Sequence, residues 1–295
     1  MKCKLCQSTQ IKIIYNDKIR NGGLGQYTTE DVPVYQCQNC NVIWHDNVLS
    51  DTKEYYESTE YRKSLEGSSE EERFYALHDR ESFEKFRYTG TDIFRNKTVA
   101  DVGCGCGAFL DFLKGVVKTI IAIEPSETYR GIMDRKDFHT YPYAEAALSD
   151  YKGKIDVITS FDVIEHVEDP ESFLRNIYEL LSNEGQAIIG TPTDAPIMRE
   201  LLGNIYEKKL LFSTQHLWIF SDSNLKMMAE KIGFSNIEIK YYQRYGISNL
   251  IGWVQNEKPC GNMQYDFVSK TLDNVYKSDC EQRGMADYIV IYLKK

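Results

Sequence analysis

The sequence lacks an apolar run long enough to cross a membrane, which takes about 20 consecutive apolar residues. Residues 1–6 lack the apolar core of a secretory signal peptide. Positive charge is also scarce, because 35 Lys and Arg stand against 44 Asp and Glu, which gives a formal net charge of -9. A nucleic-acid-binding protein needs a basic face, and none is evident. We therefore expect a cytoplasmic protein that binds neither a membrane nor a nucleic acid.

Cysteine, in contrast, is plentiful: there are eight, and four of them form two Cys-x-x-Cys pairs. The pairs are Cys3 with Cys6 and Cys37 with Cys40. In a reducing compartment, paired thiols at this spacing indicate a tetrahedral zinc site rather than disulfides. Four thiolates fill the coordination shell and leave no open position for chemistry. The sequence therefore predicts a zinc ribbon over residues 1–50 with a structural Zn²⁺.

A glycine-rich stretch follows further along the chain. Residues 98–102 are mostly small or β-branched and apolar, so they predict a buried strand. Gly103, Gly105 and Gly107 come next, and helical spacing of apolar residues begins at Ala108. A backbone without Cβ atoms can turn sharply and lie directly against a ligand. Strand, glycine turn and helix together predict the nucleotide cradle of a doubly wound α/β sheet.

The glycine pattern by itself fits two cofactors. Gly103-x-Gly105-x-x-Ala108 satisfies the dinucleotide fingerprint, so an NAD-dependent oxidoreductase is one alternative. Asp101, two residues before the first glycine, favours S-adenosylmethionine (SAM), because a carboxylate attracts a cationic amino-acid group and repels a pyrophosphate. Glu124 follows the next apolar strand, where an acid can accept both ribose hydroxyls. We therefore expect SAM as the cofactor.

Three stretches resemble motifs I, II and IV of the class I SAM-dependent methyltransferases: residues 101–109, 123–126 and 161–170. The resemblance covers about residues 80–240. It implies a Rossmann-like, seven-stranded doubly wound sheet and a SAM-dependent methyltransferase. An alternative of another class is a non-catalytic SAM-binding protein whose zinc ribbon docks a partner.

The motifs also imply a set of cofactor-binding residues. They are Asp101, Gly103, Gly105, Gly107, Glu124, Pro125, Ala144, Glu145, Phe161 and Asp162. In the family, side chains in the place of Ala144 and Glu145 flank the adenine. Phe161 and Asp162 end a predicted strand at the sheet edge where ligands bind, so we expect one of them to face the methionine part of SAM.

Two histidines are candidate catalytic bases. His166 follows Glu165 in a pair that resembles the Glu-His motif of the family, where it also has structural roles. Residues 212–221 resemble a segment of zinc-containing sugar C-methyltransferases that ends in Glu-His-Leu; His216 matches its histidine, whereas Gln215 replaces its acid. An imidazole with a pKa near about 6.5 can accept a proton at neutral pH. A purely structural role for His216 is the alternative.

The expected organisation is a zinc ribbon at 1–50, a helical lid at 51–95 and a methyltransferase core at 96–295. Insertions in the core are expected at 193–220 and 242–284. The sugar enzymes that it resembles carry a further large C-terminal domain, which this sequence lacks.

The lid and the insertions should bind the acceptor, and Tyr55, Tyr56 and Tyr61 are candidate contacts in the lid. We expect the acceptor to be a small polar metabolite, such as a sugar nucleotide or a precursor in surface polysaccharide biosynthesis. We expect methylation on oxygen, with carbon or nitrogen as alternatives. The sequence does not indicate an oligomeric state.

Overall fold

The computed structural model describes residues 1–46 and 52–295, and the chain divides into two compact units. The first unit comprises Met1–Val48, Gly190–Met228 and Glu238–Ile291. The second comprises Leu49–Ile189, Ala229–Ile237 and Tyr292–Lys295. The first unit therefore collects the amino-terminal segment and both predicted insertions. The domain limits expected from the sequence remain predictions.

A seven-stranded sheet has the order β10-β11-β8-β7-β4-β5-β6. Its strands are β4 (Thr98–Val102), β5 (Thr119–Ile123), β6 (His139–Tyr141), β7 (Ile155–Phe161), β8 (Leu181–Pro192), β10 (Asn236–Tyr242) and β11 (Tyr288–Lys294). β4 pairs in parallel with β5 and β7, and β5 pairs in parallel with β6. The carboxyl ends of these four strands therefore meet at one edge, as in the Rossmann-like sheet that the sequence predicts.

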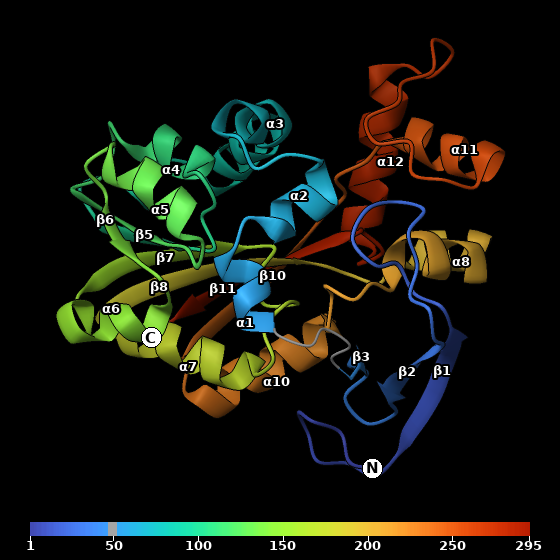
Figure 1. The fold of residues 1–295 in the computed structure, drawn as a ribbon, viewed down its shortest axis with the longest axis horizontal. Helices are drawn as coiled ribbons and strands as arrows, with labels where there is room; N and C mark the ends of the chain where they lie inside the picture. Colours follow the sequence, from blue (N-terminus) through green and yellow to red (C-terminus); the bar gives the residue numbers. More distant parts are fainter. Residues whose placement is uncertain (47–51) are drawn as a thin grey trace. The chain divides into compact units, whose positions relative to one another are not determined.

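Helices cover both faces of the central strands (Figure 1). α4 (Ala108–Leu113) and α5 (Glu127–Asp134) lie on one face, and α6 (Ala144–Tyr151) and α7 (Pro170–Leu180) lie on the other. Because both faces are covered, β4, β5 and β7 are almost entirely buried, and their sequences are mostly apolar. α7 begins with Pro170, and the Asp169 side chain caps it by accepting a hydrogen bond from the Ser172 amide.

Three helices precede β4: α1 (Thr52–Glu57), α2 (Glu60–Glu66) and α3 (Glu71–Thr89). α3 packs beside α4 (Figure 1). It is 19 residues long and densely charged. Within residues 1–46 and 52–295, no helix combines the length and the apolar character that a membrane span requires.

The first unit contains a four-stranded sheet of order β1-β2-β3-β9. Its strands are β1 (Ile11–Asp17), β2 (Val32–Cys37), β3 (Ile43–His45) and β9 (Trp218–Ile219). The three amino-terminal strands form the ribbon. β9 comes from the first insertion and pairs antiparallel with β3, placing Ile43 opposite Ile219. The insertion thus completes the sheet of the amino-terminal ribbon.

The remaining elements belong mainly to the insertions. They are α8 (Pro196–Leu202), α9 (Asn204–Tyr206), the π-helix η1 (Glu207–Leu211), α10 (Asp222–Ile232), α11 (Ile247–Asn256) and α12 (Lys270–Gln282). One buried cluster joins Val34 and Ile43 of the ribbon to Phe212 and Trp253 of the insertions. The ribbon therefore shares an apolar core with the insertions.

Candidate functional site

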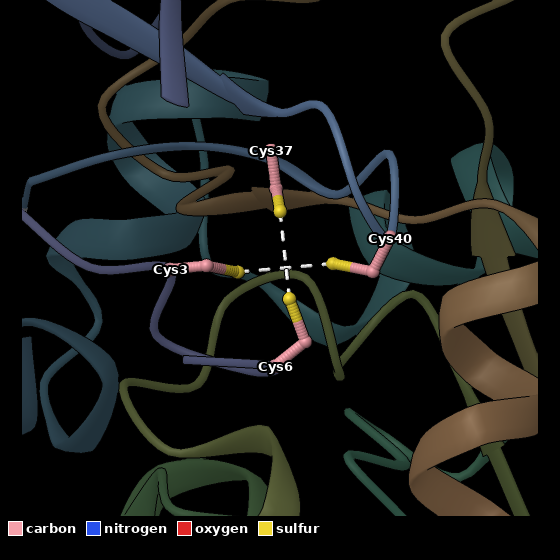
Figure 2. A group of neighbouring side chains, drawn as sticks. All are labelled: Cys3, Cys6, Cys37 and Cys40. Atoms are coloured by element: carbon pink, nitrogen blue, oxygen red, sulfur yellow. Dashed lines mark hydrogen bonds between the residues drawn. The ribbon is translucent and has the colours of Figure 1, made fainter. Parts of the chain in front are cut away.

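The two Cys-x-x-Cys pairs come together in the first unit, with their four sulfur atoms turned toward a common centre (Figure 2). The Sγ atoms of Cys3 and Cys40 lie 3.7 Å apart, and those of Cys6 and Cys37 lie 3.5 Å apart. Zn–S bonds of about 2.3 Å place tetrahedral sulfur ligands about 3.8 Å from one another. Burial raises the pKa of the Cys3 and Cys40 thiols, so a cation at the centre would be needed to hold them as thiolates. The four residues therefore fit a zinc ion.

The glycine turn between β4 and α4 is closely packed. Gly103 has φ +79°, and a Cβ atom there would lie 2.2 Å from Cγ2 of Val163. Gly105 has φ +56°, and a Cβ atom there would lie 2.5 Å from Cζ of Phe74. Any other residue would be strained and would collide with its neighbour at either position. Both glycines are therefore required by this turn.

Glu124 lies buried beside the turn, at the carboxyl end of β5. Its Oε2 accepts a hydrogen bond from the Gly105 amide at 2.9 Å, and its Oε1 accepts one from the Ser126 amide at 3.0 Å. Burial raises the pKa of Glu124, and the two amide donors and the Arg62 cation act in the opposite direction. Each carboxylate oxygen has a second lone pair. The side chain can therefore accept both hydroxyls of a ribose.

Asp101 lies in β4, opposite Thr159 of β7. The Thr159 hydroxyl donates to Oδ1 of Asp101 at 2.6 Å. Burial raises the pKa of Asp101 to about 7, while the Thr159 hydrogen bond and the Lys85 cation act to lower it. A further cation at this carboxyl would stabilise the ionised form. The site therefore favours a positively charged ligand.

Asp162 follows β7 in the left-handed region, with φ +59°. Its Oδ2 lies 2.9 Å from Nζ of Lys85 in α3, and the same ammonium contacts Glu81 at 2.9 Å. Nζ also lies 5.1 Å from the centre of the Phe161 ring. Lys85 thus links α3 to the end of β7, where the sequence placed Phe161 and Asp162.

Near the glycine turn, buried polar atoms without a hydrogen-bond partner among the described residues include Oγ of Ser126, the hydroxyl oxygen of Tyr129 and Oε2 of Glu66. Ser126 comes two residues after Glu124 and its amide donates to that carboxylate, and Tyr129 packs against Phe74 at 5.6 Å between ring centres. Buried polar atoms are rarely left without a partner. Together with the glycine turn, these atoms fit a site that binds a polar cofactor such as SAM.

The lid helices contact the glycine turn. Arg62 of α2 lies 2.5 Å from Oε1 of Glu66 and 5.0 Å from the centre of the Phe74 ring. The Tyr75 hydroxyl of α3 lies 2.9 Å from the carbonyl oxygen of Cys106. Arg62 and Lys85 carry no local signal in the sequence, because Lys and Arg are common in charged helices and nothing marks the partly buried ones.

Three predicted cofactor residues have other neighbours in the structure. Ala144 is buried at the start of α6. Glu145 is exposed, and its Oε2 accepts a hydrogen bond from Nδ2 of Asn176 at 3.2 Å. The Pro125 carbonyl oxygen accepts a hydrogen bond from Arg130. Their contacts with a cofactor remain predictions.

His166 lies buried among aromatic side chains of the second unit. Its Nδ1 is 3.1 Å from the hydroxyl oxygen of Tyr56 in α1. Its Nε2 is 3.9 Å from a carboxylate oxygen of Glu165. The Tyr61 ring lies 4.8 Å from Tyr56 and 6.1 Å from His166, between ring centres. The structure therefore places two of the predicted lid contacts beside a predicted catalytic histidine.

His216 lies in the first unit, in the turn that precedes β9. Its amide donates to the carbonyl oxygen of Ser213 at 3.2 Å. Its own carbonyl oxygen lies 3.0 Å from Nε2 of His45. His216 and His166 thus belong to different compact units, and the catalytic role of each remains a prediction.

The chain matches the family model of one type of domain. A family model described as a methyltransferase domain matches residues 70–239, which is more than half of the chain. A tRNA U34 carboxymethyltransferase from Pseudoalteromonas translucida is 25% identical over 199 residues, covering 61% of this chain and 58% of that protein. A ubiquinone biosynthesis O-methyltransferase from Caulobacter is 29% identical over 109 residues, covering 35% and 43%. The chain thus spans less than two thirds of the length of these curated relatives.

A solved structure has a similar fold. A SAM dependent methyltransferase from Archaeoglobus fulgidus aligns with a TM-score of 0.50 and 19% identity. The alignment covers 80% of this chain and 98% of that one. At this identity the likeness concerns the fold alone.

Proposed function

Since the chain belongs to the class I SAM-dependent methyltransferase family, we propose that it transfers a methyl group from SAM to a small polar acceptor. The single observation that carries the proposal is the buried pair of carboxylates, Asp101 and Glu124, on either side of the glycine turn. Asp101 suits a cationic amino-acid group, and Glu124 suits a ribose. An NAD-type cofactor would bring a pyrophosphate close to Asp101, which disfavours the oxidoreductase alternative.

The residues around the turn have distinct roles in this proposal. Glu124 would accept the two ribose hydroxyls, and the backbone at Gly103, Gly105 and Gly107 would lie against the cofactor. Asp101 and Asp162 would hold the ammonium of the methionine part. SAM supplies a methyl group on a sulfonium, which needs little further activation. The protein therefore contributes mainly by positioning the acceptor and removing its proton.

We assign proton removal to Tyr56 and His166. Burial raises the pKa of Tyr56 well above its ordinary value, so the phenol is not ionised by itself. Its hydrogen bond to Nδ1 of His166 offers a path: the acceptor hydroxyl loses its proton to the Tyr56 oxygen as Tyr56 passes its own proton to His166. The Glu165 carboxylate, 3.9 Å from Nε2, favours the imidazolium that results. With SAM bound, its sulfonium would supply the methyl group to the deprotonated acceptor oxygen. His216 is the alternative proton acceptor.

The proposed acceptor class is a small polar metabolite such as a sugar nucleotide or polysaccharide precursor, methylated on oxygen. One relative is named for O-methylation in ubiquinone biosynthesis, which is consistent with oxygen as the acceptor atom. Another is named for a modification of tRNA. The formal charge of -9 disfavours a polyanionic acceptor for this chain. Methylation on carbon or nitrogen remains the alternative within the same fold.

The test combines cofactor binding with an acceptor screen. Calorimetry should show that the protein binds SAM and does not bind NAD. Release of S-adenosylhomocysteine is then followed with nucleotide sugars, sugars, phenols and tRNA as acceptors. With the acceptor that reacts, Tyr56→Phe and His166→Asn should lower turnover by roughly 10²–10⁴-fold and leave SAM affinity intact.

His139→Asn is the matched control, because His139 is exposed and is the first residue of β6, the last strand of the sheet. Absence of SAM binding by the unchanged protein would overturn the proposal as a whole. Turnover of His166→Asn within a few-fold of the unchanged protein, together with a large loss in His216→Asn, would transfer the role of base to His216.

A further inference from the structure

His45 connects the zinc ribbon to the turn that carries His216. It is the last residue of β3 and is only 3% exposed. Its Nε2 lies 2.9 Å from the carbonyl oxygen of Ser213 and 3.0 Å from that of His216. Its Nδ1 lies 2.8 Å from the carbonyl oxygen of Asp46. Both ring nitrogens therefore face carbonyl oxygens, and with a proton on Nε2 one N–H reaches both ends of the turn formed by residues 213–216.

The same turn is attached to the ribbon by backbone contacts. The His45 amide donates to the carbonyl oxygen of Leu217 at 3.3 Å, just before β9 pairs with β3. The Thr214 amide donates to the carbonyl oxygen of Arg20 at 2.9 Å. The turn therefore depends on two segments of the amino-terminal region for its shape.

The metal cluster is only a short distance along the chain from this contact. Cys40, a proposed zinc ligand, precedes β3 by three residues, and its carbonyl oxygen accepts a hydrogen bond from Nδ2 of Asn224 at 3.2 Å. The Asn224 side chain is fully buried. The Asn224 side chain therefore fixes the backbone at Cys40, three residues before β3, and β3 ends at His45.

We propose that His45 is a positioning residue through which the metal-bound ribbon orders residues 213–216 and orients His216. Its side chain has the shape for this task, because a planar ring projects one donor between two carbonyl oxygens. The ribbon then has a role beyond its own stability: it shapes the turn of the first insertion that carries His216. The catalytic consequence rests on the proposed function, whereas the ordering of the turn does not.

Hydrogen exchange in the full-length, zinc-loaded protein tests the ordering directly, without an acceptor. His45→Phe keeps a planar ring but has no donor, and we expect the Thr214 and His216 amides to exchange at least tenfold faster. His45→Gln supplies an amide donor in place of Nε2–H and should return exchange to within about threefold of the unchanged protein. His139→Phe, at an exposed position, should leave it unchanged.

A spectroscopic readout addresses His216 itself. In protein labelled with ¹⁵N-histidine, the ring resonances of His216 should shift in His45→Phe and return toward their original positions in His45→Gln. Chelation of the metal should also accelerate exchange of the turn, while SAM affinity measured by calorimetry stays within twofold. If His45 acted only through general packing, His45→Gln would not restore slow exchange specifically at the amides of residues 213–216.

Unchanged exchange in His45→Phe would overturn the proposal, as would His45→Gln behaving like His45→Phe. If His45→Phe does not fold, His45→Gln is compared with the metal-free protein. Equal amide exchange rates in residues 213–216 with and without the metal would overturn the link between the ribbon and the turn. None of these measurements uses turnover, so failure here is distinct from failure of the methyl-transfer proposal.

Discussion

The carboxyl group of Asp101 is buried, and burial raises its pKa to about 7. Below that pH the cofactor-free protein holds the carboxyl protonated, and binding of a cationic ligand must release the proton. As the pH rises toward about 7, SAM affinity should therefore increase about tenfold for each pH unit. Above about pH 7 the affinity should level off. Calorimetry between about pH 5.5 and 8 measures this dependence.

Asp101→Asn is the control for this pH dependence. The amide has nearly the same shape but does not titrate, so its weaker binding should change little with pH. A flat profile in the unchanged protein would show that Asp101 does not face the cationic part of the ligand.

Glu124 gives a second prediction at the scale of a residue. Glu124→Ala removes an acceptor that can serve two ribose hydroxyls, and the loss should weaken SAM binding by roughly 1–3 kcal/mol. Glu124→Gln retains the shape and one acceptor oxygen, so we expect an intermediate affinity. Calorimetric dissociation constants for the three proteins provide the measurement. Equal affinity in Glu124→Ala and the unchanged protein would remove Glu124 from the site.

At the scale of an element, the attachment of α3 to the glycine turn depends on Tyr75. Its hydroxyl lies 2.9 Å from the Cys106 carbonyl oxygen and 2.9 Å from Oδ2 of Asp111, and Lys136 contacts the same oxygens. Tyr75→Phe should lower the stability of this contact by about 0.5–1.5 kcal/mol, because Lys136 still satisfies the Cys106 carbonyl oxygen. Hydrogen exchange along α3 should rise about 2–10-fold by the same principle.

Tyr141→Phe is a suitable comparison for that experiment. It also removes a hydroxyl bonded to a carboxylate, at Asp150, but lies in β6. Exchange in α3 should not respond to it. If both variants leave α3 unchanged, the contact of α3 with the glycine turn is held by apolar packing around Phe74 rather than by Tyr75.

At the scale of the whole molecule, strands of the amino-terminal ribbon and the insertions share one apolar core. Cys37→Ser should release the metal and lower the free energy of unfolding by about 4 kcal/mol if the metal is present at a thousand times its Kd. Because ribbon residues pack with Phe212 and Trp253, amide exchange should also rise in the insertions. Thermal unfolding and elemental analysis provide the measurement.

Cys260→Ser is the matched control for the metal prediction, because that thiol is half-buried and outside the cluster. It should retain one zinc per chain and nearly the original unfolding midpoint. Freshly purified, tag-free protein without zinc would contradict the assignment of the four cysteines as ligands.

Local chemistry made much of the framework predictable. The apolar run at residues 98–102 is β4, and the seven-stranded sheet is confirmed, because burial on both faces leaves a continuous apolar pattern in each central strand. The two Cys-x-x-Cys pairs meet, since the spacing within each pair already points two thiols at one centre. The family was predictable for the same reason: its motifs are short, contiguous stretches of sequence.

Contacts between distant segments were decided only by the tertiary structure. Four contacts join residues far apart in the chain: β9 pairs with β3 of the ribbon, Lys85 with Asp162, Tyr56 with His166, and His45 with the turn at 213–216. A charged helix or a lone histidine has no local pattern that identifies its partner. The sequence by itself therefore determined the fold, the family and the cysteine cluster, whereas packing decided which side chains lie together, because hydrogen bonds and ion pairs depend on distances that only the folded chain sets.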